Sequence, residues 1–365
     1  MISFSPSEEQ QQLIDTIRRF AVNDVQPIAH EADENERIPS GILKTGWNLG
    51  LIPASIPEDV GGFGELSAVT NVLALEELAY GDLAVALQVM TPALLAFPLV
   101  LYGTADQRET YLPQFLDEQP AKATAALLEP GLFFDPNDLS TTATPNGDKV
   151  MLNGAKVYVP MAATADTFLI YAKNTDTGKH EAYIVNAETS GLTVDMREGL
   201  MGVRALPMHY LALRDAEVDG NSRLGGSVGA NYETLLNRSR VALAALAVGV
   251  ANSAYDYARE YAKQRIQFGA PIATKQAIAF MLAEMAIEVD AARLMVWEAA
   301  WKLDQGENAT KEAYLAKEYA SKAAMTVTDG AVQTLGGYGF IREYPVERML
   351  RNARGFATFT GLAIV

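Results

Sequence analysis

The sequence predicts an α+β fold in which a helical part, a β part and a second helical part follow one another along the chain. Up to Gly103, apolar residues recur three and four positions apart, which is typical of amphipathic helices. From about Ala123 to Leu224 short β-rich runs replace that pattern, and from Tyr232 onward long alanine-rich helical stretches return. With 365 residues the chain is too long for one ordinary core, so we expect two or three packed units.

An N-terminal helical domain is predicted at residues 1–122. The run Ser7–Gln10 is typical of a helix N-cap with acidic residues in the first turn, and Ile17 and Phe20 follow at helical spacing. A second helix is expected around Leu75. Between them, Ile56–Gly64 contains the proline and glycines of a loop that joins helices.

A middle β domain is predicted at residues 123–230. Its β-rich runs are Val150–Val159, Phe168–Tyr171, Ala182–Val185 and His209–Leu213. Asn146 and Gly147 stand between two such runs, and this dipeptide is a strong signal for a two-residue β-hairpin.

A C-terminal helical bundle is predicted at residues 231–365. Small residues dominate the stretches Val241–Ala258 and Ala277–Leu303, as expected for helices that pack closely on several sides.

Composition excludes several classes of protein. A net charge of −16 and a pI near 4.7 argue against a nucleic-acid or anionic-membrane binder, which would need a surplus of Lys and Arg. Without cysteine the chain has no disulfide and no thiolate ligand, and we predict no metal site and a cytoplasmic location. Met1–Glu9 lacks the pattern of a secretory leader, and we expect no membrane span because Val241–Ala251 is far shorter than the roughly 18 residues required.

Three runs in the last third of the chain suggest a site for a nucleotide: Arg265–Gly269, Gln333–Gly339 and Tyr344–Arg348. An arginine at a helix end suits a pyrophosphate, Phe268 offers a ring for an adenine, and glycines let a ligand approach the backbone. Taken singly, however, each run is more often a helix end with its glycine cap. Composition and periodicity do not choose between these interpretations.

These runs resemble the C-terminal domain of the acyl-CoA dehydrogenase family, and further stretches resemble the same family in the same order over nearly the whole chain. The further stretches are Pro57–Gly64, Glu76–Ala79, Gly103–Pro113, Glu129–Pro130, Leu152–Lys156 and Phe268–Ile272.

The resemblance implies an N-terminal helical domain, a middle β-barrel or sandwich and a C-terminal four-helix bundle, with FAD between them. It also implies an oligomer in which part of each FAD is held by the neighbouring chain. The residues that would hold its adenosine diphosphate half are Arg265, Gln267, Phe268, Gln333, Gly336 and Gly337.

The chemical half of the family pattern is altered. The family's catalytic glutamate would stand at Thr360 or, in some members, at Ser239, and a hydroxyl without a partnering base cannot remove a proton from carbon. Near the flavin ring the chain has Leu128, Tyr158 and Pro160, of which Leu128 and Pro160 offer no side-chain hydrogen bond.

For the substrate, the resemblance implies contacts from Leu236, Asn237, Arg240 and Gly361. Arg240 could meet a phosphate of CoA, but an ion pair with a neighbouring carboxylate is an equally good interpretation.

The function predicted from the resemblance is α,β-oxidation of an acyl-CoA thioester, with electrons passed to an electron-transfer flavoprotein. Two alternatives stay open: a non-catalytic subunit of a mixed oligomer that completes a neighbour's FAD site, and an elimination enzyme that needs no such base. Glu129, Asp135 and Glu343 are candidate replacement bases, although a cap, a turn or a surface ion pair is the favoured interpretation of each.

Overall fold

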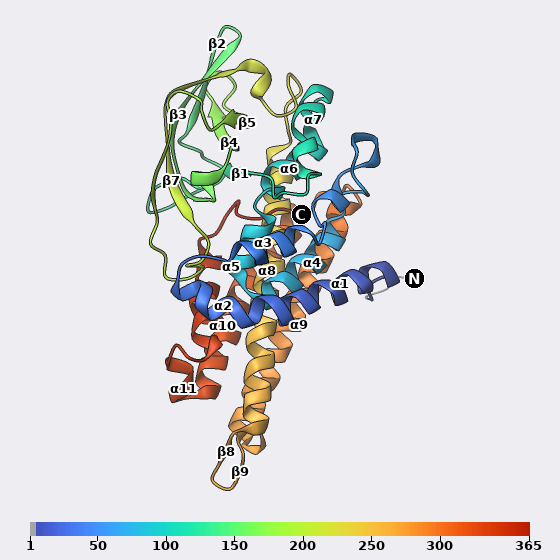
Figure 1. The fold of residues 1–365 in the computed structure, drawn as a ribbon, viewed down its shortest axis with the longest axis vertical. Coiled ribbons are helices and arrows are strands. Elements are labelled where there is room, and N and C mark those ends of the chain that lie inside the picture. Colours follow the sequence, from blue (N-terminus) through green and yellow to red (C-terminus); the bar gives the residue numbers. More distant parts are fainter. Residues whose placement is uncertain (1–4) are drawn as a thin grey trace.

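The computed structural model describes residues 5–365. The first four residues of Met1–Glu9, the stretch in which no secretory pattern was found, lie outside the described residues. Figure 1 shows the sheet at one end of an elongated molecule, the N-terminal helices across its middle and a long helical hairpin that runs to the other end. The predicted order of helical, β and helical parts is therefore confirmed.

The N-terminal part is a set of helices joined by short loops. They are α1 (Glu8–Phe20), α2 (Gln26–Glu34), α3 (Ser40–Trp47), α4 (Ala68–Gly81), α5 (Leu83–Met90), α6 (Ala93–Tyr102) and α7 (Ala105–Tyr111). The predicted cap of α1 is confirmed: Ser7 Oγ accepts from the Gln10 amide at 3.2 Å, while the Gln10 side chain accepts from the Ser7 amide at 3.0 Å. These reciprocal bonds satisfy two donors that a helix start otherwise leaves free.

The middle part is a curled sheet of seven strands. They are β1 (Ala123–Ala126), β2 (Thr142–Asn146), β3 (Lys149–Pro160), β4 (Thr167–Asn174), β5 (His180–Asn186), β6 (Leu192–Arg197) and β7 (Met208–Asp219). The path runs β1-β4-β2-β3-β7-β6, and β5 pairs with β4. The predicted hairpin is confirmed, with its turn one residue later than predicted: Asn146 pairs with Lys149, so Gly147 and Asp148 form the turn, and Gly147 has a positive φ of 67°.

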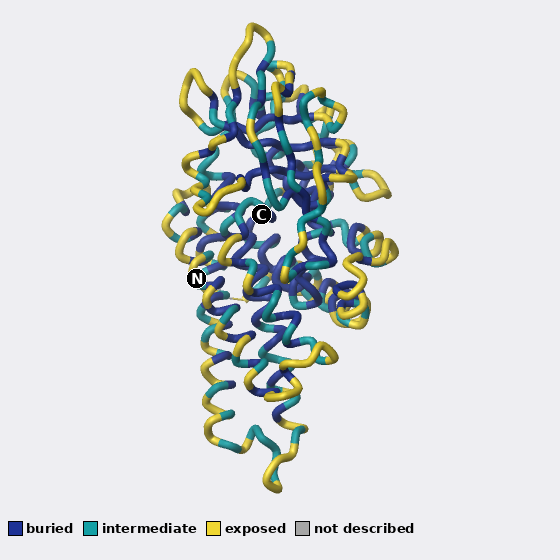
Figure 2. Tube along the Cα trace, turned by 90° about the vertical axis from the view of Figure 1, so that its left-hand side faces the viewer, coloured by how far each residue is buried: buried dark blue, intermediate teal, exposed yellow. Residues whose placement is uncertain are grey.

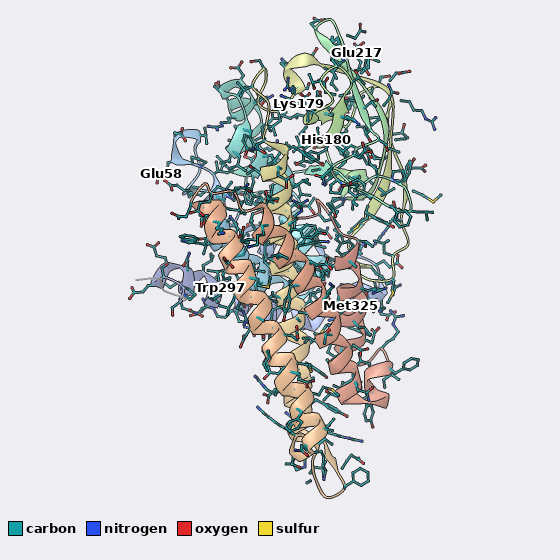
Figure 3. All side chains as sticks on the ribbon, turned by 180° about the vertical axis from the view of Figure 1, so that it is seen from behind. Glu58, Lys179, His180, Glu217, Trp297 and Met325 are labelled. Atoms are coloured by element: carbon teal, nitrogen blue, oxygen red, sulfur yellow. The ribbon has the colours of Figure 1, made fainter. Side chains whose placement is uncertain are left out.

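The C-terminal part is a bundle of long helices. Its elements are α8 (Tyr232–Gln264), β8 (Ile266–Gln267), β9 (Ala270–Pro271), α9 (Gln276–Asp304), α10 (Thr310–Leu335), α11 (Gly337–Phe340) and α12 (Pro345–Arg354). Figure 3, seen from behind, places Trp297 on α9 and Met325 on α10, away from His180 and Glu217 on the sheet.

Helix α8 is the central element of the fold. It packs against α4, α9 and α10, and Gly249 lies where it crosses α4: a Cβ at this position would be 2.2 Å from the Glu76 carbonyl oxygen. Figure 2 shows that the middle of the molecule is buried, whereas the β8–β9 end projects from it and is largely exposed. Small residues on α8 therefore allow a close helix crossing that larger side chains would prevent.

By length and composition alone, α8 could cross a membrane. This differs from the expectation that no stretch is long and apolar enough. Helices α5 and α6 pass the same test only when taken together, as a pair bent by 45°. Within its apolar window 89% of α8 is buried inside the fold. The apolar character of α8 is accounted for by its place in the core.

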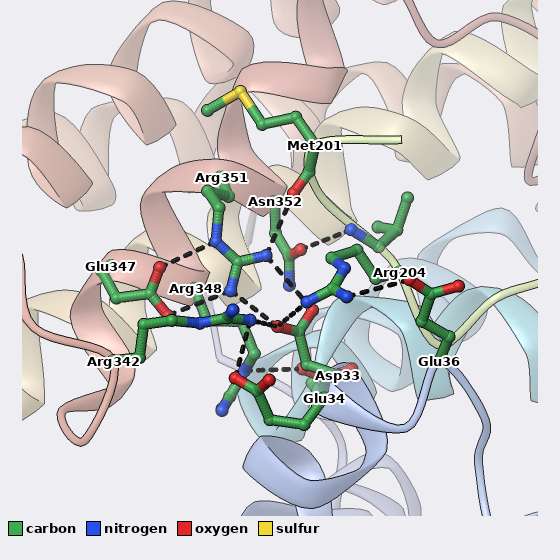
Figure 4. A network of polar contacts seen from close by, with 12 residues as sticks. Asp33, Glu34, Glu36, Met201, Arg204, Arg342, Glu347, Arg348, Arg351 and Asn352 are labelled. Carbon is green, nitrogen blue, oxygen red and sulfur yellow. Dashed lines mark hydrogen bonds and ion pairs between the residues drawn. The ribbon is translucent and has the colours of Figure 1, made fainter. Parts of the chain in front are cut away.

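A polar cluster joins the three parts of the chain (Figure 4). Asp33, near the end of α2, is 4% exposed, and Arg351 of α12 donates to its two carboxylate oxygens at 3.2 and 2.7 Å. Arg342 at 3.3 Å and Arg204, from the loop between β6 and β7, at 3.6 Å also face this carboxylate. We call these four residues the Asp33 cluster, which ties the N-terminal helices to both other parts.

Candidate functional site

The β8–β9 hairpin closes the far end of α8. Arg265 is the C-cap of α8, and the turn residues Phe268 and Gly269 have positive φ values of 51° and 78°, as expected for a tight two-residue hairpin. The Ile272 amide donates to the Arg265 carbonyl at 2.8 Å, which fixes the hairpin to the helix end. The turn leaves the Phe268 ring 94% exposed.

A groove of about 540 Å³ lies between this hairpin and the turn from α10 to α11. It is lined by all six residues predicted to hold adenosine diphosphate, namely Arg265, Gln267, Phe268, Gln333, Gly336 and Gly337. The structure therefore brings together two segments that are far apart in sequence.

The groove suits an anionic, partly aromatic ligand. The Arg265 guanidinium lies 5.1 Å from the ring centre of Tyr338, and Lys275 adds a second cation. Nothing lies within 4 Å of where a Cβ would stand on Gly336 or Gly337, so the backbone there is open to close approach. Cations, open glycine backbone and the exposed Phe268 ring fit the adenosine diphosphate half of FAD.

Sequence reasoning missed Lys275 and Tyr338 as groove residues. Tyr338 stands inside the run Gln333–Gly339, so its position was a usable signal. Lys275 comes before α9 and outside every quoted run, and only its closeness to Arg265 in sequence pointed to it.

The groove and the predicted substrate residue Arg240 lie near opposite ends of α8. Twenty-five residues of helix separate Arg240 from Arg265, which corresponds to about 38 Å at 1.5 Å per residue. Figure 1 shows the β8–β9 hairpin at the opposite end of the molecule from the seven-stranded sheet.

The two positions at which the resemblance predicts a glutamate, Ser239 and Thr360, are brought close together. Ser239 Oγ accepts a hydrogen bond from the amide of Gly361, the residue after Thr360, at 3.1 Å. The cavity beside them measures about 10 Å³, which is room for about one water molecule. Ser239, Leu236 and Gly361 line this cavity, and no Asp or Glu does so within residues 5–365.

The remaining lining of that cavity is almost wholly apolar. It comprises Leu94, Ala125, Leu127, Tyr171, Leu235, Ala363 and Ile364. Burial raises the pKa of Tyr171 well above its ordinary value, so its phenol stays protonated and is not a base.

Glu129 is held in a buried ion pair. Its carboxylate is 2.8 Å from the Lys156 ammonium and accepts from the amides of Ser140 and Thr141 at 2.6 and 2.9 Å. Burial opposes its ionisation, but Lys156 and these donors outweigh burial and hold the pKa of Glu129 below its ordinary value. A carboxylate so stabilised is a poor proton acceptor, which supports a structural role for Glu129, although its ion pair is buried and not on the surface as expected.

The two other candidate bases lie on the surface. Asp135 accepts from the Asn137 amide at 2.9 Å, which is a turn contact. Asp135 and Glu343 are both exposed, and neither lines the cavity beside Ser239.

Two of the residues predicted near the flavin ring accept hydrogen bonds through their backbone carbonyls. The Leu128 carbonyl accepts from the Val157 amide at 2.9 Å, and the Pro160 carbonyl accepts from Thr124 Oγ1 at 2.7 Å. Tyr158 has a positive φ of 53°. Their contacts with flavin stay a prediction.

Arg240 and Asn237 lie on another face of α8 than Ser239. Arg240 Nη1 donates to Glu233 and to the Asn237 side chain, both at 2.8 Å, and Asn237 donates to Thr310 Oγ1 at 2.9 Å. Neither residue lines the cavity beside Ser239, and Arg240 forms the ion pair that was the alternative interpretation.

The fold and the groove define a flavin-dependent protein of the acyl-CoA dehydrogenase type. The chain belongs to this family: models of the N-terminal, middle and C-terminal acyl-CoA dehydrogenase domains match residues 7–119, 124–216 and 230–363. Proteins of this family bind FAD, so the predicted family, fold and cofactor are confirmed. The domain limits and the roles of single residues stay predictions.

Whole proteins of known identity match the full chain. It is 37% identical to the caffeyl-CoA reductase–Etf complex subunit CarC of Acetobacterium woodii, over 98% of this chain and 96% of that protein. The butyryl-CoA dehydrogenase structure from Megasphaera elsdenii superposes with a TM-score of 0.90 at 32% identity, covering 100% and 96% of the two chains. A structure of PigA with FAD and proline gives a TM-score of 0.88 at 25% identity, covering 100% and 96%.

Proposed function

We propose that this chain is an FAD-binding oxidoreductase subunit that acts on the α and β carbons of an acyl-CoA thioester. It exchanges electrons with an electron-transfer flavoprotein. The observation that carries the proposal is the groove in which Arg265, Gln267, Phe268, Gln333 and two glycines meet. The relative CarC belongs to a reductase–Etf complex, which supports the proposed electron partner.

In this proposal the groove residues hold the adenosine diphosphate part of FAD. Arg265 and Lys275 neutralise the pyrophosphate, and Phe268 stacks on the adenine. Because the groove is about 38 Å along α8 from Arg240, the flavin ring that it serves belongs to a neighbouring chain of an oligomer. When bound, FAD would accept a hydride from the acyl-CoA or, in its reduced form, donate one to it.

A second candidate function is favoured by the small cavity beside Ser239. With about 10 Å³ of free space and no lining carboxylate, this site lacks both room for an acyl chain and a base for its α-proton. A subunit of this kind would complete a neighbour's FAD site and leave the chemistry to that neighbour. The comparisons do not favour this alternative, since relatives that match the full chain are reductases and dehydrogenases.

The decisive experiment uses the purified chain alone. FAD bound in the purified protein, bleached anaerobically by an acyl-CoA such as butyryl-CoA, would establish independent dehydrogenation and exclude the partner-subunit function. No flavin alone, with about half a flavin per subunit after mixing with a glutamate-bearing homologue, would exclude the independent enzyme.

Replacement of Arg265 tests the groove itself. Arg265→Ala is expected to lower the flavin content of whichever assembly binds FAD, because a charge-assisted contact is lost. Arg259→Ala is the matched control, because Arg259 lies near the same end of α8 but does not line the groove. Equal flavin content in both variants would refute the proposed role of Arg265.

A further inference from the structure

A second large hollow lies in the second half of α8, where this helix meets α4, α12 and residues 22–27. Its volume is about 480 Å³, and its polar lining includes Tyr80 of α4 and Ser253, Asp256, Tyr257 and Glu260 of α8. We call it the Ser253 pocket. It shares no lining residue with the groove at Arg265 or with the cavity beside Ser239, so the proposed function leaves it unused.

Ser253 brings a buried hydroxyl without a partner to this pocket. It is 4% exposed, and within residues 5–365 its Oγ makes no hydrogen bond. Hydroxyls on helices often donate to the carbonyl four residues earlier, as Ser321 and Thr328 of α10 do at 2.7 Å, but Ser253 does not. Because a buried hydroxyl without a hydrogen bond is costly, Ser253 favours a ligand that supplies one.

Two carboxylates one helical turn apart also line the pocket. Asp256 is 3.0 Å from Arg259, while Glu260 contacts Arg259 at 3.1 Å and Lys263 at 2.8 Å, both through Oε1. The side chains of Arg259 and Lys263 are 39% and 55% exposed, and ion pairs so open to water are weak. The two carboxylates therefore still attract a cation that enters the pocket.

Two arginines that adjoin the pocket are each compensated by a carboxylate of their own. Arg348 Nε lies 3.3 Å from Asp82 Oδ2, and both side chains are 7% exposed. Arg18, whose guanidinium lies 3.6 Å from the ring centre of Tyr80, donates through Nη2 to Glu77 at 2.9 Å. These arginines therefore do not cancel the pocket carboxylates, and the net charge of −16 adds to the attraction of cations.

The rest of the pocket wall is aromatic and apolar. The Tyr80 hydroxyl donates to Asp256 Oδ2 at 3.1 Å, and burial raises the pKa of both Tyr80 and Tyr257, so both phenols stay neutral. Pro345 and Met349 of α12 contribute apolar surface. Neutral aromatic rings and a thioether pack well against another ring and tolerate a nearby cation.

We propose that the Ser253 pocket binds an organic cation in which a protonated amine is joined to an aromatic body. The ammonium donates to Ser253 Oγ and to the Glu260 carboxylate, while the ring packs against Tyr257 and Met349. This inference goes beyond the proposed function and does not depend on it, because the pocket shares no residue with the groove that is proposed to hold FAD.

The test uses the purified full chain and probes that share an indole ring. Tryptamine is a cation at neutral pH, tryptophol is neutral and indole-3-propionate is an anion. Calorimetry measures the binding of each to the wild type, to Ser253→Ala and to Glu260→Gln. Glu318→Gln is the matched control, because Glu318 is also an exposed helix carboxylate paired with a lysine but does not line the pocket.

We expect tryptamine to bind at a single site per chain, and the neutral and anionic probes to bind at least about tenfold more weakly, since neither brings the charge-assisted bond. Ser253→Ala and Glu260→Gln should each weaken tryptamine binding by about fivefold to tenfold, and Glu318→Gln should not. No saturable binding of tryptamine, a preference for the anion, or equal binding to all variants would overturn the proposal. FAD content is recorded on the same preparations, so failure at the groove and failure at the pocket are distinguished.

Discussion

Replacing Glu129 with glutamine should destabilise the protein at neutral pH and much less at alkaline pH. In the wild type, Lys156 is completely buried, and its ammonium donates to Glu129 at 2.8 Å and to the Leu127 carbonyl at 3.1 Å. Glu129→Gln keeps an acceptor of nearly the same shape but removes the charge that compensates Lys156. Because Lys156 has a pKa of about 8 and can lose its proton in the variant, its uncompensated charge costs at most about 1.4 kcal/mol at pH 7.

The pH dependence follows from the pKa of Lys156. Burial lowers it to about 8 from an ordinary value of 10.5, and Glu129 prevents a larger decrease. Because the folded state then binds fewer protons than the unfolded state between pH 8 and pH 10.5, this group makes the free energy of unfolding rise with pH in that window. Without Glu129 the pKa of Lys156 falls further, so the extra cost is present below about pH 8 and fades above it.

Urea denaturation at about pH 7 and about pH 9, at equal subunit concentration, measures the effect. The variant's loss in the free energy of unfolding should shrink at the higher pH. Adding Lys156→Met to Glu129→Gln should restore most of the loss, because the uncompensated charge is gone. Asp219→Asn is the control: Asp219 and its partner Lys149 are 62% and 39% exposed, and no measurable change is expected.

Two results would refute this reasoning. One is a loss of equal size at both pH values, which would mean that the charge of Lys156 is not its source. The other is a double variant as unstable as Glu129→Gln alone, which would assign the loss to packing or to the amides of Ser140 and Thr141.

Three further predictions concern other parts of the molecule. Gly249→Ala should cost about 1–3 kcal/mol in urea unfolding, because its Cβ would meet the Glu76 carbonyl at the crossing of α8 and α4; an unchanged midpoint would mean that the helices separate freely. Asp33→Asn should cost about 1.5–3 kcal/mol by the same assay through its weakened bonds to Arg351, and wild-type stability would show that the Asp33 cluster does not hold the parts together. Lys275→Ala should weaken FAD binding by roughly tenfold in a fluorescence titration, less so at high salt; a loss independent of salt would contradict a phosphate contact.

Much of the fold was predictable because it is encoded in local patterns. The cap at Ser7, the Asn146–Gly147 hairpin and the small-residue face of α8 each depend on neighbours close in sequence, and each is present, the hairpin with its turn one residue later than predicted. One expectation differed from the structure: no stretch was expected to be long and apolar enough to span a membrane, but α8 is. Periodicity could not reveal that α8 is apolar on nearly all sides because other helices surround it.

The candidate site was predictable in part. The runs around Arg265 and Gln333 could be assigned to one nucleotide site only through their resemblance to a family, because no local rule relates residues so far apart in sequence. Neither composition nor spacing predicts the ion pair between Glu129 and Lys156, which are 27 positions apart. The same holds for the burial of Arg238.

The sequence alone determined the family and the order of the three parts; it also predicted which residues bind FAD and that Thr360 and Ser239 stand where the family has a glutamate. Only the tertiary structure decided that Ser239 meets Gly361 across 122 positions and that Ala363 and Ile364 line the small cavity beside them. The physical reason is that residue types and short-range spacing fix local conformation and available chemistry. Whether a cavity is open depends on side-chain volumes that several distant elements bring to the same place.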